Sequence, residues 1–279
     1  MLSAADYAFL TDFLRRRSGL SITSEKAYLI ESRLKPIASR LGLKSAADLV
    51  RRLRRGDEAL AGTVSDAMTT NETSFFRDKI PFDRLRDAML PALLTARRDV
   101  SRLRIWSSAA STGQEPYSIA MVLDALPQLA AWTTELLATD INAEIIERAK
   151  EGFYSEFEVL RGLPIQMLAR HFHQQAGEWR VSSSIRSRVQ FQIFNLLDSF
   201  KPLGQFDIIF CRNVLIYFDQ PTKHDVLGRL VDALAPDGYL VLGSAETVLG
   251  SGEGLQPLIN ARGIYSKRGS VQPPRVAAG

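Results

Sequence analysis

Residues 103–116, Leu-Arg-Ile-Trp-Ser-Ser-Ala-Ala-Ser-Thr-Gly-Gln-Glu-Pro, decide the fold class of this chain. The first four are typical of a buried strand, and residues 114–126 are typical of a helix that tolerates Pro116 in its first turn. The pattern repeats, with strands expected at 135–138, 206–210 and 239–242 and helices at 142–151 and 220–235. Short apolar strands that alternate with amphipathic helices indicate an α/β fold with a doubly wound parallel sheet.

The chain before this alternation is helical in pattern. Residues 1–68 predict a small all-α domain, in which apolar side chains recur at helical spacing. We expect its helices at 4–18, after the N-cap candidate Ser24, after Ser45, and at about 57–68. This domain carries an excess of basic residues, with dense blocks at 15–17 and 51–55. Such blocks either form a solvated helix face or attract an acidic partner.

The sheet domain is expected to span residues 81–268 and to begin with a helix at 81–98 that is bent near Pro91. Its alternation breaks at about 153–194. Residues 179–181 and 189–194 have strand patterns with no full helix between them, which predicts a small antiparallel β insertion.

Bulk features exclude some classes of protein. The chain has no apolar run long enough for a membrane span, so direct membrane insertion is not expected. No signal peptide is evident at the start of the sequence. The single cysteine, Cys211, fits a reducing cytoplasm. Residues 269–279, rich in proline and small residues, predict a disordered tail.

Small, amide or acidic residues follow four of the predicted strands. Ligands of parallel sheets bind beyond the carboxyl ends of the strands, so these residues are expected to converge. The segments are 107–116, 139–142, 195–198 and 211–219. A carboxylate after the second strand, Asp140, is the usual acceptor for ribose hydroxyls. The alternative is that Asp140 or Asn142 caps the next helix, and both hold if one residue caps and the other binds.

These strand ends lack the glycine pattern of a pyrophosphate site. Only Gly113 is glycine in the first loop, and Glu115 would repel a phosphate but suit a cation. The implied ligand is a nucleoside without a phosphate chain, a description that S-adenosylmethionine fits with its positive sulfonium.

The connecting segment 69–80 contains Thr70-Asn71-Glu72-Thr73-Ser74-Phe75-Phe76-Arg77-Asp78. Two adjacent phenylalanines beside an arginine indicate either an ordered lid over a site, with Phe75 and Phe76 excluding water, or a hydrophobic staple that enters the next helix.

Together these segments resemble the CheR-type chemoreceptor glutamate O-methyltransferases over nearly the full length. The matching stretches are Thr70–Asp78, Ile105–Ala120, Ala138–Asn142, Phe206–Asp219 and Gly238–Glu246. The resemblance implies a Rossmann-like class I methyltransferase sheet with a small antiparallel β insertion, preceded by an all-α N-terminal domain. It also implies S-adenosylmethionine as cofactor, S-adenosylhomocysteine as product, and a glutamate γ-methyl ester formed for sensory adaptation.

The resemblance assigns site residues by position. Arg77 and Tyr217 would be catalytic, placing the acceptor carboxylate. The cofactor-binding residues would be Asn71, Thr73, Arg77, Glu115, Asp140, Asn195, Leu196, Arg212 and Asn213. Gln114 departs from the family pattern, in which a second glutamate is common, so altered cofactor affinity is expected.

The resemblance also implies partners and a compartment. The partners would be the cytoplasmic helices of methyl-accepting chemoreceptors in the bacterial cytoplasm, and the basic block at 51–55 would steer their acidic surface. The insertion would dock on the receptor, and its short turn between 172 and 181 resembles members that do not bind a C-terminal tethering peptide.

Two rival hypotheses are a non-catalytic adaptor and a nucleic-acid methyltransferase or binder. Intact Arg77 and Tyr217 disfavour the first. The lack of an Asn-Pro-Pro-Tyr-like motif and of an interleaved aromatic-basic stripe disfavours the second, so no nucleic-acid partner is expected. No metal is expected either, because His171 and His173 do not share a helix face.

Overall fold

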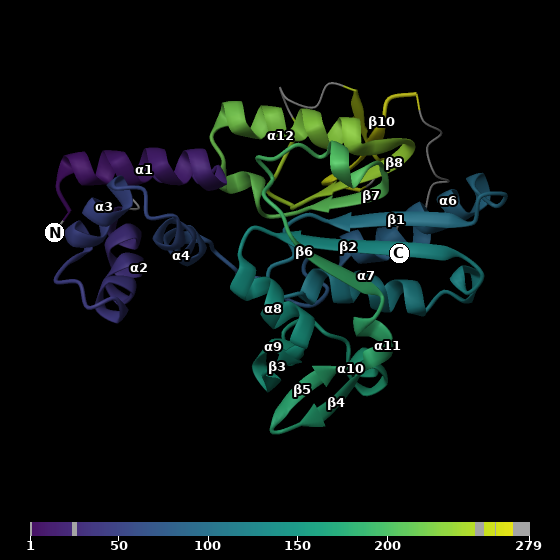
Figure 1. Ribbon diagram of the computed structural model, residues 1–279. Helices are drawn as coiled ribbons and strands as arrows, with labels where there is room; N and C mark the ends of the chain where they lie inside the picture. Colours follow the sequence, from purple (N-terminus) through teal and green to yellow (C-terminus); the bar gives the residue numbers. More distant parts are fainter. Residues whose placement is uncertain (1, 24–26, 249–253, 260, 270–279) are drawn as a thin grey trace.

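The computed structural model of the protein describes residues 2–23, 27–248, 254–259 and 261–269 (Figure 1). In this part of the chain a helical bundle precedes a large sheet flanked by helices, and a small antiparallel sheet projects from the large one (Figure 1). The expected fold class is confirmed. The predicted N-cap Ser24 and residues 270–279 of the predicted tail lie outside the described residues.

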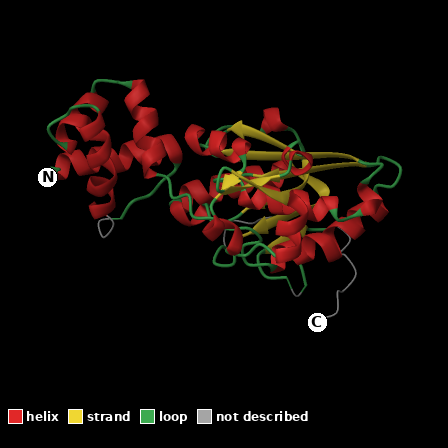
Figure 2. Cartoon of the chain, turned by 90° about the horizontal axis from the view of Figure 1, so that it is seen from below, coloured by secondary structure: helices red, strands yellow, loops and turns green. Residues whose placement is uncertain are grey.

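The N-terminal bundle is made of the four expected helices. Polar caps start three of them, because the side chains of Ser3, Ser45 and Asp57 each accept a hydrogen bond from a first-turn N–H. Buried apolar residues from all four helices form a core of their own. Figure 2 shows the bundle beside the part of the molecule that holds the strands. The helices are α1 (Ala4–Ser18), α2 (Ala27–Arg40), α3 (Ala46–Arg54) and α4 (Glu58–Met68).

The large sheet has seven strands in the order β6-β2-β1-β7-β8-β10-β9. β10 is antiparallel to both of its neighbours, and the other pairings are parallel. The carboxyl ends of the parallel strands therefore meet at one edge, as expected. The bounds are β1 (Arg102–Ser107), β2 (Thr133–Asp140), β6 (Val189–Ile193), β7 (Phe206–Cys211), β8 (Leu234–Leu242), β9 (Leu255–Pro257) and β10 (Ile264–Lys267).

Both faces of this sheet are covered, which explains the continuous apolar runs of its central strands. Successive side chains point to opposite faces, so Ile105 packs in one core cluster and Trp106 in the other. One cluster lies under α12 (Gln220–Ala233). The other lies under α7 (Gln114–Asp124) and the helical segment of residues 80–96. α8 (Ala143–Glu151) packs near β2 and β6.

The helix expected at 81–98 begins at Ile80 and, as predicted, is interrupted near Pro91. It runs as α5 (Ile80–Arg84), a π-helical turn η2 (Leu85–Met89) and α6 (Leu90–Ala96). The wider turn comes just before Pro91, which lies at the start of α6 and cannot donate a backbone hydrogen bond. Short 3₁₀ turns are η3 (Pro127–Leu129), η4 (Lys201–Leu203) and η5 (Leu215–Tyr217).

The insertion is a three-stranded antiparallel sheet in the order β3-β5-β4 with short helices around it. The assignment of residues 189–194 to this insertion is wrong, because β6 pairs in parallel with β2 at the edge of the large sheet. The insertion elements are β3 (Phe153–Tyr154), α9 (Glu156–Leu160), α10 (Ile165–His171), β4 (Phe172–Gln175), β5 (Glu178–Val181) and α11 (Ser183–Arg186).

The bundle docks on the sheet domain through the end of α1. Leu20 forms an isolated antiparallel bridge with Phe218, and the Ser21 N–H donates to the Tyr217 carbonyl. Gly19 ends α1 in the left-handed region, and a Cβ there would overlap the Phe218 ring. No helix among the described residues is long and apolar enough to span a membrane.

Candidate functional site

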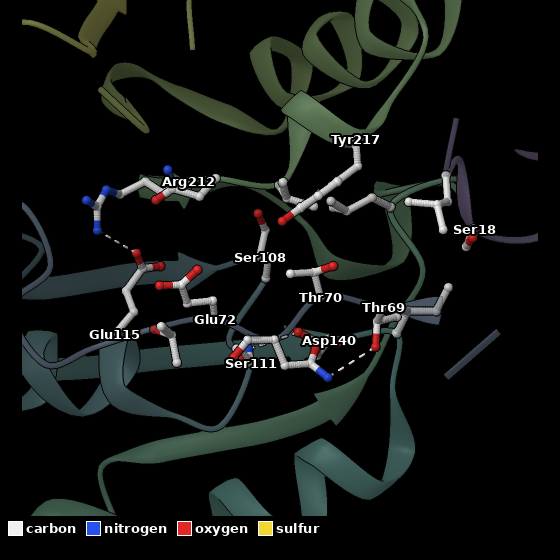
Figure 3. A pocket seen from close by; sticks show the side chains of 18 of the residues that line it. Ser18, Thr69, Thr70, Glu72, Ser108, Ser111, Glu115, Asp140, Arg212 and Tyr217 are labelled. Atoms are coloured by element: carbon white, nitrogen blue, oxygen red, sulfur yellow. Dashed lines mark hydrogen bonds and ion pairs between the residues drawn. The ribbon is translucent and has the colours of Figure 1, made fainter. Parts of the chain in front are cut away.

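A cleft opens at the carboxyl ends of the parallel strands, beneath the segment of residues 69–78, which we call the lid (Figure 3). Its empty volume is about 970 Å³, part of it open to solvent. All ten site residues expected from the sequence line this cleft: Asn71, Thr73, Arg77, Glu115, Asp140, Asn195, Leu196, Arg212, Asn213 and Tyr217.

Glu115 lies on the floor of the cleft, in the first turn of α7. Its carboxylate accepts hydrogen bonds from the Ser107 hydroxyl at 2.8 Å and from Arg212 Nη1 at 3.0 Å. Burial raises the pKa of Glu115, while Arg212 and the Ser107 hydroxyl oppose that rise. A buried carboxylate with a single cationic partner is suited to a cationic ligand group.

Arg212 connects this floor to the lid. Its side chain is 1% exposed, and Nη2 donates to the Arg77 carbonyl at 2.9 Å and to Asp78 Oδ2 at 2.7 Å. Its Nε is buried without a protein partner. Arg212 was expected to complete the pocket, and the geometry adds that it fastens the end of the lid to Glu115.

Asp140 ends β2 and faces the first loop. Its carboxylate accepts hydrogen bonds from the Ser111 N–H at 2.9 Å and the Asn142 N–H at 3.1 Å. Burial raises the pKa of Asp140, and these backbone donors oppose the rise. The two residues of this turn have different roles. The Asn142 side chain caps α8, and Asp140 faces the cleft.

Tyr217 lies on η5, which follows β7. Figure 3 shows its side chain reaching into the cleft from the side opposite Asp140. The turn before it is held by Glu246, which accepts from the N–H groups of Asn213, Val214 and Leu215 and from that of Gly243. Sequence reasoning gave no role to Glu246, although it follows the end of β8 and is 3% exposed.

The lid is ordered, but its phenylalanines do not face the cleft. Phe75 is fully buried between the rings of Tyr154 and Phe172 in the insertion, and Phe76 packs on Phe82. The expectation that both exclude water from the site is therefore wrong. They anchor the lid in the core, as a staple would, while the lid's polar residues line the cleft.

Both ends of the lid are held by arginines. At its start, Arg33 of α2 donates to the carbonyls of Met68 at 2.6 Å and Thr69 at 2.9 Å. These carbonyls end α4, where cations are favourable. At its other end is Arg212. Between them, the Asn71 carbonyl accepts from the Ser111 hydroxyl at 3.0 Å.

The N-terminal domain contributes a wall that sequence reasoning missed. Ser18 and Leu20 line the cleft. The Asn195 side-chain amide donates to the Arg17 carbonyl at 2.7 Å, so it satisfies a carbonyl at the end of α1. No pattern in residues 15–20 signals this contact, because it depends on how the two domains dock.

Metal ligands and a reactive thiol are not features of this cleft. Among the residues that the structure describes, no three His, Cys, Asp or Glu side chains gather closely enough to hold a metal ion. Cys211 is fully buried, and burial raises the pKa of its thiol, so it is a packing residue.

The fold and the cleft together define an S-adenosylmethionine-dependent methyltransferase of the Rossmann-like class. The family model described as "CheR methyltransferase, SAM binding domain" matches residues 71–262, and "CheR methyltransferase, all-alpha domain" matches residues 5–69. The chain belongs to this CheR methyltransferase family.

Similar proteins carry matching names. The chain is 44% identical over 250 residues to "Chemotaxis protein methyltransferase 1" of Pseudomonas aeruginosa, covering 88% of this chain and 90% of the relative. It is 42% identical over 252 residues to "Chemotaxis protein methyltransferase Cher2" of Pseudomonas putida, covering 88% and 91%. It is 40% identical over 255 residues to "Chemotaxis protein methyltransferase" of Vibrio parahaemolyticus, covering 89% and 91%.

Proposed function

We propose that this protein transfers a methyl group from S-adenosylmethionine to glutamate side chains of methyl-accepting chemoreceptors, giving γ-methyl esters and S-adenosylhomocysteine. Membership of the CheR family supports the reaction class. The observation that carries the proposal is a cleft with two buried carboxylates at its base, Glu115 and Asp140, and with Arg77 and Tyr217 also in its lining.

The residues present fit this cofactor. Asp140 would accept hydrogen bonds from the ribose hydroxyls, and Glu115 would face the amino-acid part. Asn71, Thr73, Asn195, Leu196 and Asn213 would border the remainder. Small side chains in the first loop, Ser108 and Ala109, allow close approach to the backbone. The bound cofactor supplies an electrophilic methyl group on a positive sulfonium, which carboxylate oxygens tolerate.

A general base is not required. A glutamate carboxyl has a pKa near ~4.3, so the acceptor is ionised at neutral pH. None of the described residues that line the cleft is a histidine, consistent with a reaction that needs no proton abstraction. The remaining tasks of the protein are to hold the acceptor and to exclude water.

Arg77 and Tyr217 are proposed to place the acceptor carboxylate. Arg77 is partly buried, and its Nη1 donates to the Glu72 carbonyl at 2.9 Å, which leaves other guanidinium donors available. A bidentate grip would reduce the nucleophilicity of the carboxylate, so we propose that Arg77 holds one oxygen and that the Tyr217 hydroxyl guides the group. Correct alignment is worth up to roughly 7–11 kcal/mol of the barrier in good cases.

The proposed partners are the cytoplasmic helices of the receptors, in the bacterial cytoplasm and without a C-terminal tethering peptide. A two-residue turn, Ala176-Gly177, joins β4 and β5, which supports the short form of the insertion. Most arginines of the basic block on α3 already have carboxylate partners within the protein. Arg51, Arg52 and Arg54 pair with Asp48, Asp57 and Asp6, so steering of an acidic surface rests on the net field of these groups.

Mass spectrometry of receptor peptides tests the proposal. Cytoplasmic fragments from a panel of chemoreceptors are incubated with the protein and S-adenosylmethionine. A mass increase of one methyl group on specific glutamates is expected, and the ester should disappear under mild alkali. If calorimetry shows that S-adenosylhomocysteine binds but no fragment gains a methyl group, the proposed acceptor class is wrong.

A further inference from the structure

The insertion touches the lid at three points. Arg161, which follows α9, forms an ion pair with Glu72 at 2.7 Å. Gly162 lies directly against the backbone of Phe75. The Phe75 ring packs edge-on against Tyr154 and Phe172, with ring centroids 4.9 and 5.5 Å away. The small antiparallel sheet is therefore the outer support of the lid, as well as a projection from the domain.

Gly162 is required at its position for two independent reasons. Its φ of 96° is unfavourable for residues with a side chain. A Cβ added there would also overlap the Phe75 carbonyl oxygen, which is a backbone atom and cannot rotate away. Any larger residue must push the insertion and the lid apart.

Glu72 connects this support to the proposed catalytic residue. Its carboxylate faces Arg161 of the insertion, while its carbonyl accepts from Arg77 Nη1 at 2.9 Å. A displacement of the lid at Glu72 or Phe75 therefore moves the group that holds the Arg77 guanidinium.

The lid backbone also needs external support. Phe76 and Asp78 of the lid, and Lys79 directly after it, have positive φ values of 48°, 65° and 41°. Such residues cost on the order of 1–3 kcal/mol each and persist only where the surroundings hold them. Arg212 holds one side of this segment, at Arg77 and Asp78, and the insertion holds the other, at Phe75.

We propose that the insertion positions Arg77 for methyl transfer, with Gly162 and Arg161 as positioning residues that act through Phe75 and Glu72. This inference rests on the proposed function of the cleft. The Gly162 contact should dominate, because the Arg161–Glu72 pair is half exposed and such pairs contribute little.

The decisive comparison is between Gly162→Ala and Gly177→Ala in the full chain. Both glycines lie in the insertion with positive φ, but a Cβ at Gly177 meets nothing within 4 Å. Transfer of a radiolabelled methyl group to a receptor fragment gives kcat, and calorimetry with S-adenosylhomocysteine gives Kd.

For Gly162→Ala we expect kcat to fall at least about tenfold, since small misplacements of reacting groups are costly. The Kd should change by less than about threefold, because Asn71 is held separately by Ser111. Gly177→Ala should leave both values near those of the wild type. Equal kcat values for the two variants would overturn the inference.

A second set of variants covers the case in which Gly162→Ala fails to fold. Arg161→Gln and Glu72→Gln, singly and together, should each lower kcat about two- to fivefold, and the double variant should be no worse than either single one. Strictly additive losses, or none, would overturn the role of this pair. Absence of methyl transfer by the wild-type protein would instead contradict the proposed function.

Discussion

Arginines occupy two very different settings in this protein. Arg212 is 1% exposed and is bonded to Glu115, Asp78 and the Arg77 carbonyl. The arginines of α3 also have carboxylate partners, but Arg51 is 67% exposed and Arg52 is 49% exposed. The ion-pair chemistry is the same, and burial alone separates them.

This difference determines what each pair can do. Water screens the pairs on α3, so each contributes little to stability and tolerates change. A buried pair cannot lose one member without leaving the other charge in the interior. Arg212 and Glu115 therefore fix geometry at the cleft, whereas the α3 arginines only shape the field around the bundle.

The largest effect is expected from Arg212→Met. Loss of this cation leaves Glu115 buried without its charged partner and frees the end of the lid, which should cost about 3–5 kcal/mol of unfolding free energy. Binding of S-adenosylhomocysteine should become undetectable by calorimetry. Arg51→Met is the matched control and should unfold at nearly the same denaturant concentration as the wild type. Equal losses of unfolding free energy in the two variants would contradict the proposed difference between the buried arginine and the exposed ones.

A smaller effect is expected from Glu246→Gln. The carboxylate accepts four backbone N–H groups, and an amide oxygen can replace only part of this set. Because unpaired buried donors cost about 1–3 kcal/mol, chemical denaturation should show a loss of that size, with kcat reduced by the displaced Tyr217. Glu58→Gln removes an exposed carboxylate and is the control. Wild-type stability and kcat in the Glu246→Gln variant would show that the turn at residues 213–215 does not depend on this carboxylate.

Asp140→Asn tests a buried carboxylate whose charge is proposed to favour ligand binding but whose burial destabilises the fold. Loss of the charged acceptor should raise the Kd for S-adenosylhomocysteine about 10- to 100-fold. The folded-state pKa of Asp140 is raised by burial above its ordinary value of 3.8, so its contribution to stability is lost as the pH rises through the folded-state pKa.

The sign of that shift gives a second readout. Relative to the wild type, the unfolding free energy of Asp140→Asn should increase as the pH rises from the ordinary aspartate pKa of 3.8 through the raised folded-state pKa, because the variant has no buried charge to accommodate. Thermal or urea unfolding at several pH values measures it. A relative stability that falls over this range would contradict the shift.

The smallest effect is expected from reversing Arg51, Arg52, Arg54 and Arg55 to glutamate. The Kd for S-adenosylhomocysteine should not change, since these residues are remote from the cleft lining. The methylation rate at low salt should fall a few-fold and recover toward the wild-type ratio as salt screens the field. An unchanged rate at low salt would refute steering by α3.

Much of the fold follows from local sequence patterns. Every residue of the central strand β7 is buried because helices cover both faces of the sheet, and the largely apolar pattern of residues 206–210 shows this in the sequence. β6 was misassigned because an edge strand is partly exposed, with alternating Val189 and Gln190, and because the insertion separates it in sequence from α8, the helix of its crossover. A strand that directly follows a hairpin in sequence is easily assigned to the same small sheet.

Site residues could be predicted from the sequence where polar side chains follow the ends of strands, as at Asp140 and Arg212, and in the lid at Arg77. The orientation of Phe75 could not be predicted, because the sequence around a buried phenylalanine does not show which neighbouring unit its ring enters. The place of Leu20 and Ser18 in the cleft lining could not be predicted for a related reason, because the docking of the two domains brings the end of α1 to the cleft. Glu246 could have been found by applying the strand-end rule to β8.

The carboxylate of Glu246 has one more consequence. Three successive N–H groups, at residues 213–215, with Asn213 in the left-handed region, form the kind of concavity that elsewhere binds phosphate. Here the protein fills it with its own anion. The concavity is therefore closed to an external anion, and the turn that carries Tyr217 is fixed by the chain's own carboxylate instead of by a ligand.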